Sequence, residues 1–431
     1  MRLLPRSLFA IAFIAFIGIV GTWLGQFETI WRVFAVAIVV LILFEFLDAQ
    51  SWPLQLKLDQ PNQLGLGAYH LATLSLTNAG RKSRTFRFRP VTPRGVGGDQ
   101  KDHQATLRPG HIASENFELM GTRLGEHDWP RQPVEIIGLL GFSAWIRRVP
   151  IETMSRVVPD TAAHRRSRIG AIDMGARRDP IAMGQGDELR SLRDYAPGDP
   201  PSTIDWKVSA RQRRLVVREL EADRHIEIIF ALDAGQASSL ACEKLTLLGH
   251  YANVAARLAV TAEAYGDRYG LVVFADRVYA SLGIGNGVGH QRKLHNTLAA
   301  VRSSNAAANP LPAMVAVSRM AERRSLIVLF TQLDHAQADG QLLQATTLLR
   351  PKHLPLLVAV RDPAVAQLEN RTAQHWLDPY VSLAASEHRQ DVIAARQRLS
   401  RLGANVIEAE PRELDARVLN RYAELRRTNR V

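Results

Sequence analysis

Two apolar stretches lie near the start of the chain. Leu8 to Leu24 carries no charge, and a second stretch, Val33 to Phe44, follows after a few residues. The first is close to the length that a bilayer crossing requires. A cleaved signal peptide is the alternative, but no clear small-residue cleavage site follows the first stretch. The pattern therefore predicts a transmembrane helical hairpin within residues 1–50.

The charges beside these stretches predict the orientation of the hairpin. Arg2 and Arg6 precede the first stretch, and basic residues favour the cytoplasmic side of a membrane. Two crossings return the chain to the side where it began. We therefore expect a multi-pass protein of the bacterial inner (cytoplasmic) membrane, with its soluble domains in the cytoplasm.

Short runs of alternating hydrophobic and polar residues follow the hairpin, for example Leu54 to Leu58, His70 to Leu76 and Thr85 to Arg89. Alternation is typical of strands that bury one face, and Gly, Pro, Asn and Asp separate the runs at fairly even spacing. The pattern predicts a β-sandwich-like domain over residues 51–158.

The last part of the chain alternates continuous apolar runs of strand length with stretches of helical periodicity. The first such run, Ile226 to Leu232, is typical of a strand buried on both faces. Strands that alternate with helices indicate a mainly parallel sheet covered on both faces, with a ligand crevice at the carboxyl ends of its strands. Residues 223–431 are thus predicted to form a Rossmann-type α/β domain.

A segment dense in charge, Asp187 to Glu221, precedes this domain and contains the run Pro197-Gly198-Asp199-Pro200-Pro201. Proline presets the backbone angle φ and aspartate bonds to nearby backbone, so the run predicts a fixed turn between two flanks. We interpret residues 159–222 as a linker followed by this motif.

The motif resembles the signature of the domain of unknown function 58 family. The matching residues are Gly186, Glu188, Leu192, Arg193, Tyr195, Gly198, Asp199, Ile204, Asp205, Trp206, Ser209, Ala210, Arg211, Leu215, Val217, Arg218 and Glu219. The resemblance implies a membrane hairpin, a β-rich region, this signature and then a von Willebrand factor A-like domain. It also implies a partner, an AAA+ ATPase of the MoxR type, in chaperone-like assembly or envelope-stress work.

The charged motif could have a catalytic or a structural role. Paired carboxylates can carry out acid–base hydrolysis, and the candidates here are Glu188, Asp194, Asp199, Asp205 and Glu219. Each lies within a few residues of a basic side chain, which lowers the pKa of a carboxylate and makes it a poor general acid. We favour a structural clasp between the two soluble domains, in which these acids pair with Arg190, Arg193, Arg211, Arg214 and Arg218.

The clasp hypothesis makes two specific predictions. Asp205 is expected to pair with a nearby arginine, and the Trp206 ring is expected to be buried at the domain junction because an apolar alternation, Leu215 to Val217, follows it. Tyr195, Gly198 and Glu219 are assigned to the same structural or binding motif.

The von Willebrand A-like resemblance also implies a metal-ion-dependent adhesion site, with Asp-x-Ser-x-Ser after the first strand. Here that element reads Asp233-Ala234-Gly235-Gln236-Ala237, so both serine positions lack a hydroxyl. Magnesium needs oxygen ligands in octahedral positions. We interpret Asp233, Thr331 and Asp334 as the remnant of a degenerate site, and we expect no bound metal and no other cofactor.

Composition and charge limit the partners and the enzyme classes that the chain could have. The net charge of +12 invites a nucleic-acid partner, but acidic and basic residues are interleaved in the motif. Membrane lipid is the favoured partner for the excess charge, and no nucleic acid is expected. The one cysteine, Cys242, excludes an intramolecular disulfide. No Walker A, Gly-x-Ser-x-Gly or His-Glu-x-x-His sequence occurs.

The combined prediction is a membrane-anchored protein-interaction module with a degenerate von Willebrand A-like domain, without catalytic residues and not an enzyme, working with a MoxR-type AAA+ ATPase. The alternative, an uncharacterised hydrolase that uses the acidic motif, stays open at this stage.

Overall fold

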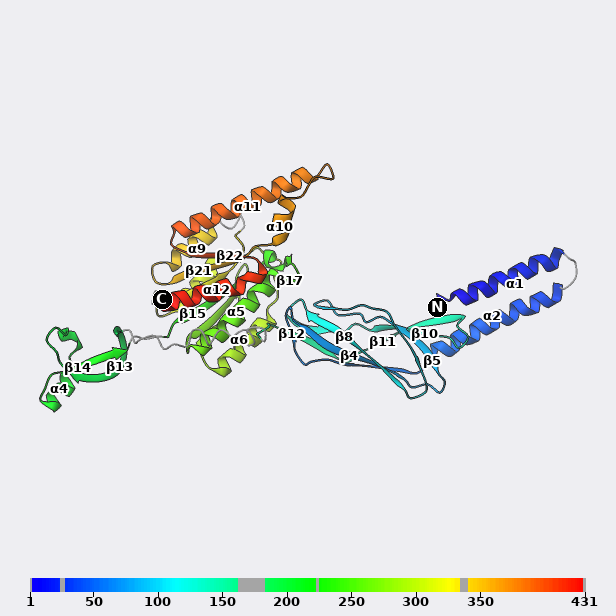
Figure 1. The fold of residues 1–431 in the computed structure, drawn as a ribbon, viewed down its shortest axis with the longest axis horizontal. Helices are drawn as coiled ribbons and strands as arrows, with labels where there is room; N and C mark the ends of the chain where they lie inside the picture. Colours follow the sequence, from blue (N-terminus) through cyan, green and yellow to red (C-terminus); the bar gives the residue numbers. More distant parts are fainter. Residues whose placement is uncertain (1, 24–27, 162–182, 222–224, 334–339, 429–431) are drawn as a thin grey trace. The chain divides into compact units, whose positions relative to one another are not determined.

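The computed structural model describes residues 2–23, 28–161, 183–221, 225–333 and 340–428 (Figure 1). The chain divides into two compact units. The first contains Met1–Asp160 with two short later segments, Ala241–Gly249 and Leu298–Arg302. The second contains the remainder of the chain. As a whole the chain is a mixed α/β protein with apolar helices at its N-terminus.

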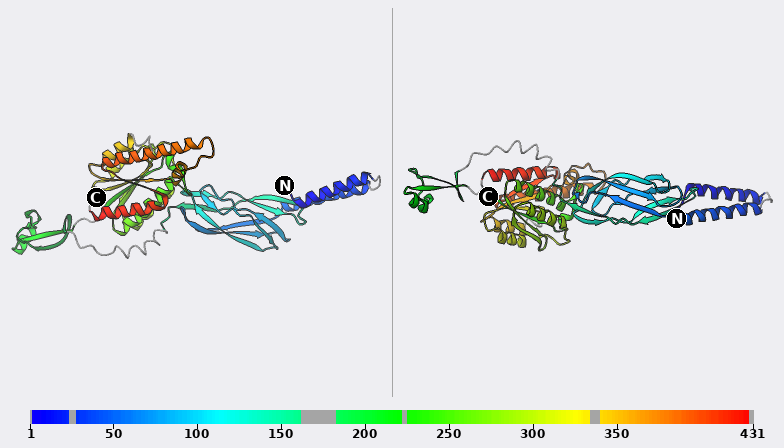
Figure 2. Two further views of the ribbon diagram at one scale, coloured as in Figure 1. Left: turned by 45° about the horizontal axis from the view of Figure 1, so that its top comes forward. Right: turned by 90° about the horizontal axis from the view of Figure 1, so that it is seen from below.

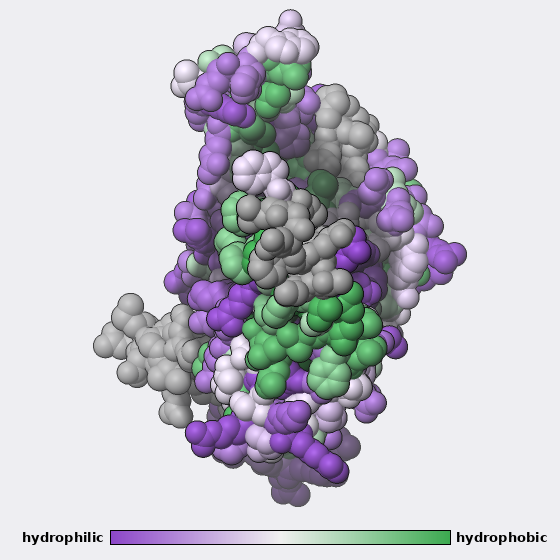
Figure 3. All heavy atoms as spheres, turned by 90° about the vertical axis from the view of Figure 1, so that its right-hand side faces the viewer, coloured by the Kyte–Doolittle hydropathy of each residue, from purple (hydrophilic) through white to green (hydrophobic). Residues whose placement is uncertain are grey.

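Two helices begin the first unit, α1 (Pro5–Trp23) and α2 (Glu28–Gln50). They lie side by side in the views of Figures 1 and 2. Within the described residues, length and composition qualify one helical segment as a membrane span, Arg32–Gln50 of α2, and the apolar part of α1, Pro5–Val20, is shorter. Many of their apolar side chains are exposed, and Figure 3 shows a hydrophobic area where the hairpin faces the viewer.

The C-terminal end of α2 is fixed to the β-rich region by one carboxylate. Glu45 is 4% exposed, and it accepts hydrogen bonds from the backbone N–H groups of residues 140–143. These N–H groups lie in the turn between β10 (Gln132–Ile137) and β11 (Ser143–Val149). A Cβ on Gly138 would approach the Glu45 carboxyl carbon within 2.2 Å, so the turn needs glycine there.

The β-rich region is built mainly from antiparallel strand pairs, and β12 (Met154–Val158) and β3 (Leu64–Gly65) form a parallel pair. Burial alternates along its longest strands, as the sequence pattern predicted, so each of these strands turns one face to the interior. One sheet has four strands in the order β2 (Leu54–Asp59), β4 (Tyr69–Asn78), β8 (Ile112–Gly121) and β6 (Val96–Gly98). Another has five, β1 (Arg2–Leu3), β11, β10, β5 (Arg84–Phe88) and β7 (His103–Leu107).

A third, smaller sheet completes this region with β3 (Leu64–Gly65), β12 (Met154–Val158) and β9 (Gly125–Asp128). Buried polar contacts tie the large sheets together. The Asn78 side chain accepts from the Trp52 indole at 2.9 Å and donates to the Leu107 carbonyl at 3.0 Å. The sandwich-like part of the prediction thus corresponds to packed antiparallel sheets.

The second unit contains a six-stranded sheet. Its strand order is β19 (Val278–Gly285), β18 (Arg268–Phe274), β15 (Glu227–Asp233), β20 (Leu326–Phe330), β21 (Leu354–Val360) and β22 (Asn405–Ala409). All neighbours pair in parallel except β19, which is antiparallel to β18. The mainly parallel sheet was predicted, but the antiparallel edge strand was not.

Helices cover both faces of this sheet (Figure 1). Buried side chains of α7 (Pro310–Met320), α9 (Gln341–Leu349) and α11 (Asp378–Arg401) share one core with alternate residues of the central strands. On the opposite face, α5 (Leu247–Ala264) places Tyr251 against Phe330, with ring centroids 5.7 Å apart. Helix α12 (Pro411–Arg427) is joined to α5 by an ion pair of Asp415 with Arg257. Two further helices are α6 (Val288–Ala300) and α10 (Pro363–Glu369).

A buried aspartate anchors the last helix. Asp267 has no exposed surface, accepts from the Ile226 N–H at 3.0 Å and accepts from the Tyr422 hydroxyl of α12. Burial raises the pKa of this carboxyl above its ordinary range, because the charged form loses its hydration. The hydrogen bonds from Tyr422 and Ile226 act in the opposite direction.

Candidate functional site

The signature motif folds as a small antiparallel pair with a short helix. Strand β13 (Met183–Asp194) pairs with β14 (Val216–Glu221), and Leu192 stands opposite Arg218. The connection contains a 3-10 turn, η1 (Pro201–Thr203), and helix α4 (Trp206–Gln212). We call residues 192–218 the signature unit. The side chains of the predicted site residues Glu188 and Glu219, and that of Arg190, lie outside those that the structure describes.

The predicted turn is present, and an arginine holds it. Gly198 has φ of +109°, a conformation that side-chain-bearing residues rarely adopt, which explains why glycine stands there. Both Asp199 oxygens accept from the Arg193 guanidinium, at 2.7 and 2.8 Å, and one also accepts from the Ala196 N–H at 2.9 Å. The bond from Arg193, followed by that from Ala196, holds the pKa of Asp199 below its ordinary range. The predicted arginine–aspartate pairing is correct for these two residues.

The prediction that Asp205 pairs with an arginine is wrong. Asp205 is the N-cap of α4, and its Oδ1 accepts from the N–H groups of Lys207 and Val208 at 3.1 and 3.0 Å. The first N–H groups of a helix have no partner within the helix, so a short acidic side chain before it supplies one. Ser209, which is buried, bonds through its hydroxyl to the Val216 N–H at 2.9 Å and so connects α4 to β14.

The prediction that Trp206 is buried is also wrong, because 65% of its surface is exposed. The buried positions of the signature unit are filled by Ile204, Ser209, Val216 and Val217. So small a unit has little interior, and the tryptophan, at the first position of α4, stays on its outside. Whether the unit clasps the two domains together stays a prediction.

The other predicted residues lie around this surface. Tyr195 is half-buried, and its N–H donates to the Leu215 carbonyl at 2.9 Å. Arg211 and Arg218 are exposed. Asp194 forms an ion pair with Arg214 at 2.9 Å, and both side chains are more than half exposed. Leu192 and Leu215 are also largely exposed, at 41% and 45%.

The second candidate place is the carboxyl end of the parallel strands in the α/β domain. Asp233 closes β15 and is 1% exposed. Its Oδ2 accepts from the Thr331 hydroxyl, which follows β20, at 2.7 Å, and its Oδ1 accepts from the Gly235 N–H at 2.7 Å. Asp233 and Thr331 thus both lie at the carboxyl ends of parallel strands, where they were expected from the sequence. Asp334 lies outside the described residues.

The donors described at this edge do not fit a magnesium ion. Gly235 and Ala237 have no side-chain oxygen, and both Asp233 oxygens already accept hydrogen bonds from protein groups. Ser238 bonds back to the Asp233 carbonyl at 2.7 Å. Within the described residues, no three His, Cys, Asp or Glu side chains are grouped so that they could hold a metal. The expectation of no bound metal is itself untested.

One exposed surface was not foreseen from the sequence. Trp376 is 79% exposed and Tyr380 67% exposed at the start of α11, and Leu377 and Leu383 beside them are also exposed. The sequence feature that could have indicated this surface is the run His375-Trp-Leu-Asp-Pro-Tyr380, in which bulky apolar residues surround a proline at a helix start.

Comparison with known proteins matches one region of the chain to a protein family. Residues 191–398 match the family model described as "Protein of unknown function DUF58". This region of the chain matches the DUF58 family. The match includes the whole signature unit and extends through much of α11. The resemblance seen in the signature residues is therefore confirmed.

The curated relatives that match this chain carry the description "uncharacterized protein". Uncharacterized protein Rv1480 of Mycobacterium tuberculosis and uncharacterized protein Mb1516 of Mycobacterium bovis are each 26% identical over 235 residues, which cover 49% of this chain and 72% of the relative. Among solved structures, a conserved hypothetical protein BatB from Bacteroides thetaiotaomicron is 15% identical, with a TM-score of 0.27, and the match covers 41% of this chain and 98% of that one. The CARDB domain of a Pyrococcus furiosus protein gives a TM-score of 0.18 at 14% identity, over 25% of this chain and 96% of that one.

Proposed function

We propose that this protein is a membrane-anchored protein-interaction module and that the signature unit carries a contact with its partner. The exposed Trp206 is the observation that supports this most directly. A large aromatic side chain that remains in water gains from being covered by a partner, and tryptophan is enriched among the residues that dominate binding energy. The exposed Leu192 and Leu215 extend the apolar area.

The hydrolase alternative receives less support from the same unit. A general acid must hold a proton near neutral pH, but Asp199 is doubly bonded to Arg193 and its pKa is lowered. Asp205 is occupied as a helix cap. Neither of these two carboxylates is therefore suited to acid–base chemistry, and we propose a module without enzymatic activity.

The α/β domain fits the same role as a degenerate von Willebrand A-like domain. Its mainly parallel sheet, with Asp233 and Thr331 at the carboxyl ends of neighbouring strands, agrees with such a domain. The missing hydroxyls at positions 235 and 237 support partner binding that does not pass through a metal ion. The assignment rests on this arrangement and on the family resemblance.

The apolar helices α1 and α2 support a membrane hairpin with the remaining domains in the cytoplasm. Arg2 precedes the first helix and Arg6 lies in its first turn, and both helices expose many apolar side chains. Protease added to intact spheroplasts should leave residues after Gln50 uncut, and lysis of the spheroplasts should expose them. Digestion from the periplasmic side before lysis would reverse the proposed topology and remove a cytoplasmic ATPase as the partner.

The partner suggested by the family resemblance is an AAA+ ATPase of the MoxR type. The full-length chain in detergent micelles and a purified MoxR-type ATPase from the same genome allow a direct measurement by biolayer interferometry. Trp206→Ala should weaken the complex about 30-fold or more, the size typical of an interface tryptophan. Trp376→Ala, which removes another largely exposed tryptophan from the α/β domain, is the matched control and should bind like the wild type.

Three outcomes have defined meanings. Loss of binding only in Trp206→Ala supports the proposal. Equal binding by wild type and Trp206→Ala would refute the role of the signature unit. Absence of binding by the wild type would remove the MoxR-type ATPase as the partner.

A further inference from the structure

The sheet of the α/β domain ends in a strand whose outer edge is open. Strand β22 is the last in the strand order, and within the described residues no other strand pairs with its outer edge. Its first four residues, Asn405 to Glu408, are half-exposed. An open edge presents unpaired N–H and C=O groups in the spacing that a further strand requires. Natural edges often carry proline or lysine, and the sequence of β22, Asn-Val-Ile-Glu-Ala, has neither.

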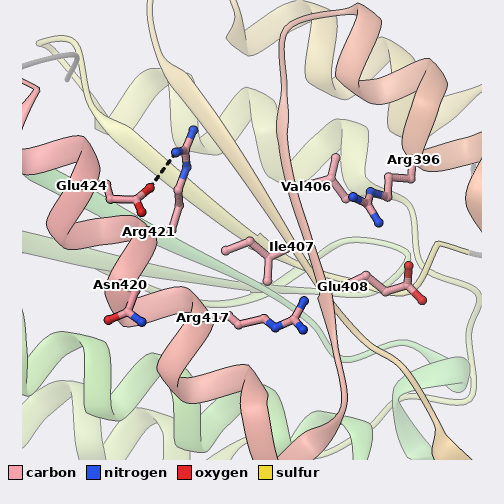
Figure 4. A pocket seen from close by; sticks show the side chains of 8 residues that line it. All are labelled: Arg396, Val406, Ile407, Glu408, Arg417, Asn420, Arg421 and Glu424. Carbon is pink, nitrogen blue, oxygen red and sulfur yellow. Dashed lines mark hydrogen bonds and ion pairs between the residues drawn. The ribbon is translucent and has the colours of Figure 1, made fainter.

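This edge lies in a hollow. The space measures about 280 Å³, and its lining comes from three elements, with Val406, Ile407 and Glu408 of β22 between side chains of α11 and α12 (Figure 4). Val406 packs against the core on the α11 face, and Ile407, the next residue along the strand, lies toward the other face. The edge is therefore a groove between two helices.

Three arginines surround the groove: Arg396 from α11, and Arg417 and Arg421 from α12. Arg417 pairs with Glu413 of its own helix at 2.8 Å, but both side chains are more than half exposed. Such an exposed pair on a helix surface is weak, so an incoming carboxylate can compete for Arg417. Arg421 pairs with Glu424 and donates to the Asn405 side chain. Among the residues described, Arg396 has no ion-pair partner.

The spacing of two of these arginines matches an extended chain. Arg417 and Arg421 are four residues apart on α12, which corresponds to a rise of about 6 Å along the helix. Alternate residues of a β-strand, which point to the same side, are about 6.6 Å apart. A segment with acidic residues at every second position would therefore direct two carboxylates at these two arginines while its backbone continues the sheet.

We infer that the groove beside β22 binds an extended acidic segment of a partner protein by strand addition, with Arg417 and Arg421 recognising the carboxylates of its alternate residues. Main-chain hydrogen bonds to β22 supply affinity, and the arginines select acidic side chains. The inference rests on the proposed interaction role but uses a different surface from the signature unit. The two proposals can therefore fail separately.

Fluorescence anisotropy with the full-length chain in detergent micelles tests it. The probe is a labelled decapeptide in which glutamate alternates with valine or threonine, and a peptide of the same composition with its glutamates in one block is the control. The alternating peptide should bind at least ten-fold more tightly than the block peptide. Added salt should weaken its binding, because exposed charge pairs are screened.

Charge reversal identifies the arginines. Arg417→Glu should weaken binding of the glutamate peptide at least ten-fold and improve binding of the equivalent lysine peptide. Arg427→Glu makes the same charge change on an exposed side chain of α12 that does not line the groove, and it should bind the glutamate peptide like the wild type. Trp206→Ala should also bind this peptide normally, so a failure of the signature-unit proposal remains distinguishable.

Backbone methylation separates strand addition from simple charge attraction. Two peptides carry N-methyl groups on alternate amides, one along each edge. The peptide methylated on the edge that faces β22 should lose binding, and the other should keep it. Equal binding of both methylated peptides would refute strand addition. No saturable binding of the alternating peptide, or a cross-link of β22 to a second copy of this chain in its place, would also overturn the inference.

Discussion

The signature unit and the parallel sheet of the α/β domain use acidic residues in opposite ways. In the signature unit, Asp199 and Asp205 remain near solvent and hold a turn and a helix start. In the α/β domain, Asp233 and Asp267 are almost fully buried and connect strands to loops and helices. The large aromatic side chains follow the same division, since Phe230 has no exposed surface and Trp206 is mostly exposed. A dense run of charge with a tryptophan therefore marks an outer surface in this chain.

The first prediction contrasts these two aromatic residues. Phe230→Ala, in the centre of β15, should lower the free energy of unfolding by about 3–5 kcal/mol, because it leaves a cavity in a close-packed core. Trp206→Ala should change it by no more than about 0.5 kcal/mol, as expected for an exposed site. Hydrogen exchange followed by mass spectrometry on the full-length chain reports both regions separately. A large loss of stability in Trp206→Ala would restore the buried-junction hypothesis.

The second prediction concerns the buried Asp233–Thr331 pair at the carboxyl ends of two central strands. Thr331→Val keeps the side-chain volume but removes the hydroxyl that donates to Asp233, so we expect a loss of about 1–3 kcal/mol. Thr346→Val is a matched control, because its equally buried hydroxyl donates to the Leu342 carbonyl within its own helix. Chemical denaturation should show the smaller loss for Thr346→Val. Equal losses would mean that the carboxylate gives the Thr331 bond no special strength.

Periodicity predicted the parts of the fold that are governed by burial. The apolar run at Ile226 to Leu232 became a central strand, and the alternation at residues 70–76 became β4. The antiparallel strand β19 was missed because its burial alternates between half-exposed and exposed residues, as on a sheet edge, which produces no apolar run. Short elements such as α10 carry too few residues for a helical period to be evident.

The candidate site was predicted less completely, for a physical reason. The residue types in the signature identified the turn and the Arg193–Asp199 pair, because both depend on neighbours in sequence. The exposure of Trp206 depends on how much interior a small unit can form, and sequence spacing does not contain that quantity. The groove beside β22 depends on strand order, which places the last strand at the edge of the sheet.

The third prediction tests the cap of α4. Asp205→Ala should destabilise the signature unit by about 1 kcal/mol, because the Lys207 and Val208 N–H groups lose their acceptor. Asp205→Ser retains a good N-cap and should recover most of the loss. Exchange of the α4 amides is the measurement. Equal effects of alanine and serine would favour a role for the carboxylate charge over capping.

The last and smallest effects are opposite pH responses of the two regions. The pKa of Asp199 is lowered from its ordinary value of 3.8, so its contribution to stability is present above that value and is lost as the pH falls through the folded-state pKa. The pKa of Asp267 is raised from 3.8, so its contribution is full below that value and is lost as the pH rises through the folded-state pKa.

Acidification below about pH 4 should therefore loosen the turn at residues 196–199, while protonation of Asp267 favours the folded α12. Hydrogen exchange corrected for the intrinsic rate should show protection falling in the turn with decreasing pH, and Asp199→Asn should flatten that response. Asp267→Asn should remove the opposite response from α12. Parallel pH slopes in the two regions would contradict the division between surface and buried acids.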